Sequence, residues 1–227
     1  MDISIFEVLG PIMVGPSSSH TAGAAKLARI GGLIAGSPYH HVSFGLHGSF
    51  AKTYKGHGTD KALVAGALGL KEDDERLVDA FELADRKGIT YDFYEIELDH
   101  MHENSVKMTF SMNDGSLCEV IGSSIGGAQI IITRINDFET ELTAQSSTLI
   151  INQYDKKGVV SEVSTVLANN DINIGVMKLS RKAKGDIASC MIETDDSIPE
   201  YAIESLKKIK NVLSVKVINN EGCASYV

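Results

Sequence analysis

Three adjacent serines, a histidine and a threonine form the segment of this chain that is richest in side chains able to do chemistry. The segment reads Gly15-Pro16-Ser17-Ser18-Ser19-His20-Thr21, and a small-residue stretch follows it directly. Gly and Pro favour a turn, and Ser19 or Thr21 can cap the helix that we expect next. The free amides of a helix start attract anions. The segment therefore indicates a site for a small acid beside a titratable imidazole, with an ordinary serine-rich helix cap as the alternative.

A second histidine stands in a glycine-rich turn, Gly56-His57-Gly58-Thr59-Asp60. Two flanking glycines allow the backbone to approach a ligand closely. Thr59 or Asp60 can cap the helix that the pattern predicts through Ala67. A histidine in this setting indicates a site role for His57, whereas a lone surface histidine would not.

Two further histidines, His100 and His102, are spaced as on one side of a strand that Ile96 and Leu98 predict. This spacing would suit a metal pair, but no nearby Asp or Cys with clear spacing completes a ligand set. We therefore predict no metal site in this chain. The later segment at residues 122–127 (GSSIGG) is predicted as a loop that could cradle a carboxylate, although it lacks the spacing of a phosphate-binding loop.

The cysteine count limits the redox and metal chemistry of the chain. Cys118, Cys190 and Cys223 lie far apart and form no C-x-x-C pair. Neither a zinc ribbon nor a thioredoxin-like site is therefore encoded. A cubane iron–sulfur cluster is usually held by four thiolates, and three scattered cysteines cannot supply them.

Composition and charge exclude several classes of function. The chain has 227 residues with 43% hydrophobic and 22% charged residues, as in ordinary globular proteins. A formal net charge of −9 argues against nucleic-acid binding, which needs a basic face. No apolar run is long enough to cross a bilayer, and no basic segment precedes an apolar one at the N-terminus. We expect a cytoplasmic protein.

The hydrophobic pattern predicts an α+β fold in two domains, at residues 1–143 and 148–227. The first is a mixed α/β domain with a helix from Thr21 to about Ile34, a strand around Phe44, and a hairpin that turns at Asn113-Asp114-Gly115. The second shows the order βαββαβ, a ferredoxin-like split βαβ unit. Its expected form is a four-stranded antiparallel sheet with both helices on one face.

The second domain resembles the ACT domain, a regulatory module that commonly senses amino acids. The resemblance covers residues 148–218 and is carried by the turn Asp155-Lys156-Lys157-Gly158-Val159 and by Asn173-Ile174 at the next strand. It implies effector binding at Gly158, Val159, Asn173 and Ile174, and pairing of this domain with another copy. A dimerisation module without a ligand is the alternative.

Nearly the whole chain resembles the beta chain of the iron–sulfur-dependent bacterial L-serine dehydratases. The run from Gly15 to Thr21 and the turn from Gly56 to Asp60 carry the resemblance. His102-Glu103-Asn104 is similar to a third family element that usually has proline in the middle. Where the family usually has three glycines, Ala128 follows Gly126-Gly127 here. The first domain also resembles the allosteric substrate-binding domain of some phosphoglycerate dehydrogenases.

The resemblance implies an L-serine ammonia-lyase that forms pyruvate and ammonia. Its [4Fe–4S] cluster acts as a Lewis acid, and we expect a separate alpha chain to hold that cluster. His57 is the leading general base, because an imidazole suits proton removal near neutral pH. His20 is the second candidate, as a proton shuttle or as an orienting group. The other implied site residues are His102 and Asn104 and the substrate-binding set Ser17, Ser18, Ser19 and Thr21.

Two other classes of function remain open at this stage. The chain could be a purely regulatory subunit that binds serine or another amino acid and has no catalytic residues. The same hydroxyls and imidazoles would then form an effector site. An autonomous metal-dependent hydrolase built on the histidines is a third interpretation.

Overall fold

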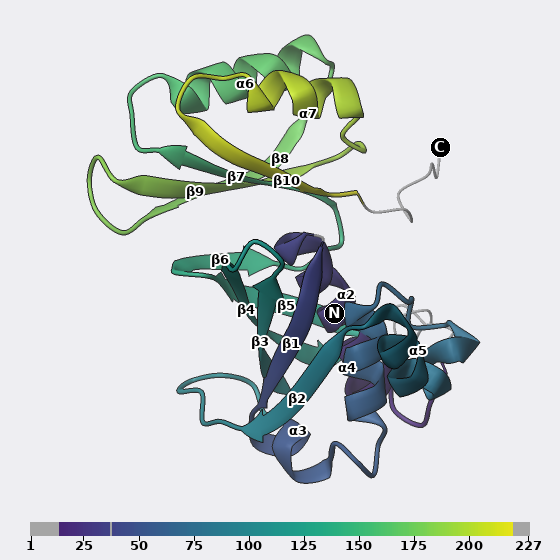
Figure 1. Cartoon of the computed structure of the whole chain (residues 1–227). Helices are drawn as coiled ribbons and strands as arrows, with labels where there is room; N and C mark the ends of the chain where they lie inside the picture. Colours follow the sequence, from purple (N-terminus) through teal and green to yellow (C-terminus); the bar gives the residue numbers. More distant parts are fainter. Residues whose placement is uncertain (1–13, 37, 220–227) are drawn as a thin grey trace, which may run out of the picture. The chain divides into compact units, whose positions relative to one another are not determined.

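The computed structural model describes residues 14–36 and 38–219, and the chain divides into two compact units (Figure 1). The first unit runs to Asn136 and also includes residues 141–143. The second unit takes residues 137–140 and continues from Ala144. No helix in the described ranges is long and apolar enough to cross a membrane.

A six-stranded mixed sheet with the order β2-β1-β3-β4-β5-β6 forms the frame of the first unit. Strand β2 runs parallel to β1, and the pairs β1/β3, β3/β4 and β4/β5 are antiparallel. The turn at Asn113-Asp114-Gly115 joins β3 to β4, as predicted. The strands are β1 (Tyr39–Leu46), β2 (Thr90–Glu95), β3 (Ser105–Met112), β4 (Leu117–Gly126), β5 (Gln129–Ile135) and β6 (Phe138–Leu142).

Helices cover one side of this sheet, where Figure 1 shows α2, α4 and α5. Alternate residues of β1 and β3, such as Phe44 and Met108, are fully buried, because side chains of a strand alternate between its two faces. The helical segments are η1 (Ser18–Ala22, a π-helical turn), α2 (Gly23–Ala35), α3 (Gly48–Thr53), α4 (Thr59–Ala67), η2 (Glu75–Asp79, a 3-10 turn) and α5 (Ala80–Lys87).

Helices α2 and α4 approach each other closely through small residues. A Cβ atom added to Gly66 would lie 2.1 Å from the carbonyl oxygen of Ala25. The neighbouring residues Ala24, Ala28 and Ala65 are all fully buried. Backbone therefore meets backbone between the two helices, and glycine is required at position 66.

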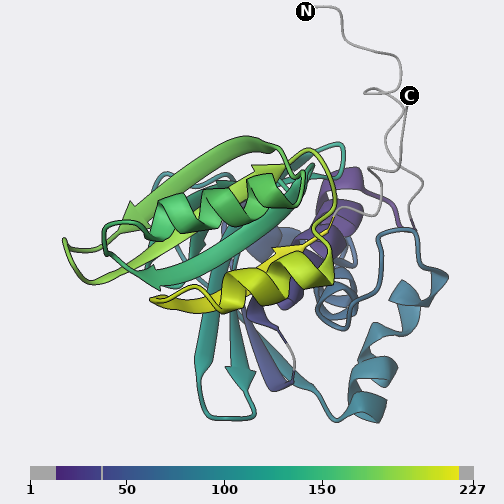
Figure 2. The ribbon, with the colours of Figure 1, turned by 90° about the horizontal axis from the view of Figure 1, so that it is seen from above.

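The second unit has the predicted βαββαβ order and the antiparallel strand order β10-β7-β9-β8. Figure 2 shows both helices on one face of this sheet, as expected. Leu149, Val163 and Leu206 lie in the apolar core between the two layers. The elements are β7 (Ser147–Tyr154), α6 (Val159–Asn169), β8 (Ile174–Arg181), β9 (Ile187–Thr194), α7 (Glu200–Lys207) and β10 (Val212–Ile218).

Two sequence predictions for the first unit were wrong. The strand predicted at Ile96 and Leu98 lies earlier, at Thr90–Glu95, because its parallel partner β1 ends at Leu46. The predicted loop at residues 122–127 is mostly strand, since β4 continues to Gly126. A Cβ on Gly122 would lie 2.7 Å from the carbonyl oxygen of Ile131. Gly122 therefore serves close packing, whereas Gly126 and Gly127 adopt positive φ angles with open space around them.

The helix contact yields a test at Gly66. Gly66→Ala should lower the free energy of unfolding in urea, because an overpacking cost of about 1–3 kcal/mol exceeds a gain in helix propensity of about 1 kcal/mol. Gly31→Ala in α2 is the matched control, since its Cβ would meet the flexible end of Met108 at 2.7 Å. That variant should lose less stability. Equal stability losses in the two variants would contradict the interpretation.

Candidate functional site

The serine-rich segment forms one π-helical turn that leads directly into α2. The sequence predicted Ser19 or Thr21 as the cap, but Ser17 has this role. Its hydroxyl accepts a hydrogen bond from the amide of His20 at 3.1 Å, and its carbonyl accepts one from the amide of Thr21 at 3.0 Å. The carbonyl of Ser18 accepts from the amide of Gly23. The turn leaves the hydroxyl of Ser19 available to the imidazole beside it.

The imidazole of His20 is held at both ring nitrogens. Nδ1 lies 3.2 Å from the hydroxyl of Ser19, and Nε2 lies 3.1 Å from the hydroxyl of Ser49 at the start of α3. The ring also meets Phe50 edge-on, with 5.4 Å between ring centroids. His20 is therefore a half-buried group in a fixed orientation.

His57 stacks obliquely on His20, with ring centroids 4.9 Å apart and an angle of 35° between the planes. Its Nδ1 lies 3.3 Å from the carbonyl oxygen of Thr53. Because a carbonyl can only accept, Nδ1 carries the proton and Nε2 keeps a free lone pair. The ring is exposed. His57 therefore has the geometry of a base that can take a proton from a bound molecule.

Thr21 ties the two motifs together. Its buried hydroxyl donates a hydrogen bond to the carbonyl oxygen of His57 at 3.1 Å, across 36 residues of sequence. The predicted binding residue Thr21 thus holds the turn that carries His57.

The surroundings of His20 lower its affinity for a proton. Burial lowers the pKa of His20 below its ordinary value, and the nearby charge of His57 lowers it further. Desolvation disfavours the charged form, and so does a like charge. His20 therefore stays neutral to lower pH than an ordinary histidine does.

The third motif reaches the same end of the sheet through backbone hydrogen bonds. The amide of Ser49 donates to the carbonyl of Glu103 at 2.7 Å, and the amide of Ser124 donates to the carbonyl of Asn104 at 2.9 Å. The amide of Asn104 donates to Nδ1 of the exposed His102 at 3.1 Å. Asn104 itself is buried. The segment around Glu103 therefore lies against the turn that supports His20.

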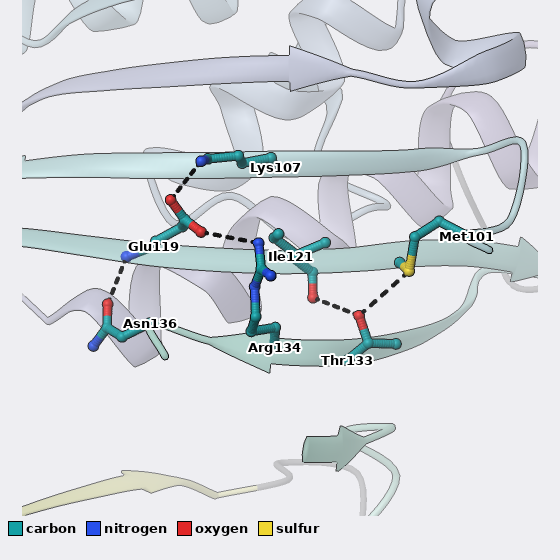
Figure 3. Close-up of polar contacts among 7 residues, drawn as sticks. All are labelled: Met101, Lys107, Glu119, Ile121, Thr133, Arg134 and Asn136. Atoms are coloured by element: carbon teal, nitrogen blue, oxygen red, sulfur yellow. Dashed lines mark hydrogen bonds and ion pairs between the residues drawn. The ribbon is translucent and has the colours of Figure 1, made fainter. Parts of the chain in front are cut away.

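Figure 3 shows how this segment is anchored on the sheet. The hydroxyl of Thr133 on β5 lies 3.7 Å from the sulfur of Met101 and 3.4 Å from the carbonyl oxygen of Ile121. Beside it, Glu119 pairs with Lys107 at 2.6 Å and with Arg134 at 3.3 Å. These contacts join β3, β4 and β5 next to the segment that carries His102 and Asn104.

The sequence analysis missed one residue of this site, Ser49, and assigned another, Ser124, to the wrong element. Ser49 is a single serine after Gly48 and belongs to no recognisable pattern, so nothing in the sequence marked it. Ser124 was placed in a loop, but it lies in β4 with its hydroxyl fully buried and without a hydrogen-bond partner among the described residues. A Cβ on Gly23 would lie 2.0 Å from that hydroxyl, so the start of α2 packs directly on it.

The predicted effector residues of the second unit lie at two opposite ends of its sheet, Gly158 and Val159 after the Tyr154 end of β7, and Asn173 and Ile174 at the Ser147 end. Gly158 has a φ of 95° at the helix cap, and the buried Val159 follows it. The side-chain amide of Asn173 donates to Asp195 at 2.6 Å, and Ile174 opens β8. The sequence analysis missed Gln153 on β7, whose buried Oε1 has no hydrogen-bond partner within the described ranges.

The cysteines of the described ranges do not fit a metal cluster. Cys118 is buried in β4, and Cys190 is buried in the core of the second unit, where desolvation raises its thiol pKa to about 11. Cluster ligation needs an accessible thiolate. Cys223 lies outside the described residues. Across residues 14–36 and 38–219, no three His, Cys, Asp or Glu side chains gather as a metal site.

Comparison with known proteins agrees with both sequence resemblances. Residues 4–88 match the family described as "Serine dehydratase beta chain", and residues 147–211 match the ACT domain. A D-3-phosphoglycerate dehydrogenase of Bacillus subtilis is 29% identical over 197 residues, which cover 84% of this chain and 37% of that protein. Its similarity extends over both units.

Two relatives match the chain over almost its full length. The L-serine dehydratase beta chain of Peptoniphilus asaccharolyticus is 42% identical over 218 residues, which cover 96% of this chain and 98% of the relative. A probable L-serine dehydratase beta chain of Bacillus subtilis is 40% identical over 215 residues, with 95% and 97% covered. With this identity along both chains, and with the paired histidine turns and the βαββαβ unit in place, the chain belongs to the serine dehydratase beta chain family.

Proposed function

We propose that this chain is the beta subunit of an L-serine ammonia-lyase, which converts L-serine to pyruvate and ammonia together with an alpha chain. The names of the full-length relatives support this assignment. The observation that carries it is the stacked pair of His20 and His57 beside three serine hydroxyls. The pair offers one exposed base and one neutral imidazole in a setting suited to a small amino acid.

In the proposed reaction, Nε2 of His57 takes the α proton of serine. The α carbon keeps the electron pair, which forms a double bond to the β carbon as the β hydroxyl leaves. The resulting enamine becomes an imine and is hydrolysed to pyruvate and ammonia. A [4Fe–4S] cluster on the alpha chain would supply the Lewis acid for the leaving hydroxyl. The two described thiols of this chain do not fit that cluster.

The remaining residues of the site bind and orient the substrate. The hydroxyl of Ser18 would donate a hydrogen bond to the substrate carboxylate, and the oxygens of Ser17 and Ser19 would accept from the substrate amine. Asn104 would contribute from the opposite segment. The neutral state of His20 matters, because a positive charge on this ring, whose centroid lies 4.9 Å from that of His57, would repel the proton that His57 takes.

A regulatory subunit is the second candidate function. The similarity to a D-3-phosphoglycerate dehydrogenase, an enzyme with a different named activity, favours this interpretation. A ligand-binding region that occurs in both enzymes would account for this sequence similarity. The His20 and His57 site would then bind an effector, and the chemistry would belong to the alpha chain.

Replacement of His57 distinguishes a catalytic subunit from a regulatory one. In the complex with the alpha chain, His57→Ala should lower kcat by about 100-fold or more, since a general base contributes that much. Pyruvate formation from L-serine is the measurement, and His40→Ala, at an exposed histidine of β1, is the control. An unchanged maximal rate with a shifted serine dependence would instead indicate an effector site.

The surroundings of His20 also predict the direction in which its pKa is shifted. In an NMR titration of the full chain, His20 should titrate below its ordinary pKa of 6.5. His57→Gln should raise the His20 pKa towards that value without reaching it, because burial remains the larger cause. The folded state disfavours protonated His20, so protonation of this ring favours unfolding. The folded state is therefore most stable, as far as His20 is concerned, above pH 6.5, and it loses this stability as the pH falls through the folded pKa. A His20 pKa at or above 6.5 would contradict the described packing.

We also propose that the ACT domain pairs with another copy and binds an amino acid at Gly158, Val159, Asn173 and Ile174. L-serine is the probe, and isothermal titration calorimetry on the full chain is the measurement. Asn173→Ala should weaken binding by about tenfold, the effect of losing roughly one hydrogen bond. Asn170→Ala, which changes only a bond to the carbonyl of Val166 at the helix end, should bind like the unaltered chain. Equal affinity in all three proteins would rule out Asn173 as a ligand-binding residue.

A further inference from the structure

Ser49 belongs to none of the three motif segments, yet its side chain contacts His20. Its hydroxyl lies 3.1 Å from Nε2 of that ring. The backbone of Ser49 is fixed on both sides, because its amide donates to the carbonyl of Glu103 at 2.7 Å and its carbonyl accepts from the hydroxyl of Thr53 at 2.8 Å. The structure thus sets the position of the Ser49 backbone independently of His20.

The hydroxyls on the other side of the ring extend the hydrogen-bond chain. The oxygen of Ser17 already accepts the amide proton of His20, and it lies 3.4 Å from the hydroxyl of Ser19. If Ser17 donates to Ser19, then Ser19 donates its own proton to Nδ1 of His20. Ser17 and Ser19 then each accept one proton and donate one. In the reverse direction the oxygen of Ser17 would accept two protons, and Ser49 would donate to Nε2. The first direction is the one that we infer.

This direction determines the tautomer of His20. A neutral imidazole has one donor and one acceptor nitrogen. With Nδ1 accepting from Ser19, the ring proton is on Nε2 and is donated to Ser49. The edge contact with Phe50 and the stacking on His57 allow little rotation of the ring.

We propose that Ser49 is a positioning residue for the reaction, because it accepts the Nε2 proton of His20 and so fixes that ring in one tautomer and one orientation against His57. The inference rests on the proposed function, in which His57 is the base. An imidazole that turns or changes tautomer would present a different surface to His57 and would release the hydroxyl of Ser19. Partners of this kind orient catalytic imidazoles in other enzymes.

The tautomer is measured on the full chain without the alpha chain. Long-range proton–nitrogen NMR of ¹⁵N-histidine-labelled protein reports which ring nitrogen carries the proton. His20 should carry it on Nε2 in the unaltered chain and show a mixture of tautomers in Ser49→Ala. Ser49→Thr keeps the hydroxyl and should restore the Nε2 form. Ser43→Ala is the control, because that hydroxyl binds Asp92 on the neighbouring strand. An Nδ1-protonated ring, or the same tautomer in Ser49→Ala, would overturn the proposal.

The effect on the reaction is measured in the complex with the alpha chain. Ser49→Ala should lower kcat by about 10-fold, as loss of an orienting partner of an imidazole does, with little change in the KM for serine. Ser49→Thr should recover most of the rate. An unchanged kcat in Ser49→Ala would refute the positioning role. A complex that forms no pyruvate even with the unaltered chain would refute the proposed function, and the NMR comparison then decides the tautomer by itself.

Discussion

The close packing of α2 on α4 is the constraint on which the candidate site depends. The carbonyl oxygen of Ala25 lies so near Gly66 that no side chain fits between the two helices. Both motif turns stand at the starts of these helices, the serine turn before α2 and the His57 turn before α4. The contact of Ala25 with Gly66 lies between the first turn of α2 and the last turn of α4, and it fixes the two helices against each other. Their leading turns are joined separately, by the hydrogen bond from Thr21 to the carbonyl of His57 and by the stacking of the two imidazoles.

The sheet supplies the other half of the site. Strand β1 ends at Leu46 and leads into α3, which places Ser49 and Phe50 against His20. The segment between β2 and β3 packs its backbone at Glu103 onto the first turn of α3. Gly48 permits this approach, since its φ is 57° and a Cβ there would lie 2.7 Å from the carbonyl oxygen of Glu103. The reactive side chains therefore sit on a rigid support, as catalytic orientation requires.

The second unit is built on a different principle. Its core is a simple layer of helices on an antiparallel sheet, and two unusual features lie near the loop before α6. Gly158 adopts a positive φ there, and the buried Oε1 of Gln153 has no hydrogen-bond partner among the described residues. A buried polar atom without a partner costs free energy, so this unit retains a feature that packing alone does not explain. The proposed effector role accounts for it.

The sequence by itself determined the βαββαβ order of the second unit, the hairpin at Asn113-Asp114-Gly115 and the two histidine turns, because local periodicity and turn residues encode such features. It did not reveal α3, which is only six residues long, or the strand character of residues 122–126. Only the tertiary structure decided that Ser17 caps the turn, that Thr21 bonds to the His57 loop, and that Ser49 contacts His20. These contacts join residues up to 36 positions apart. Their geometry is set by how closely two helices and a sheet can pack, and no local pattern in the chain records that distance.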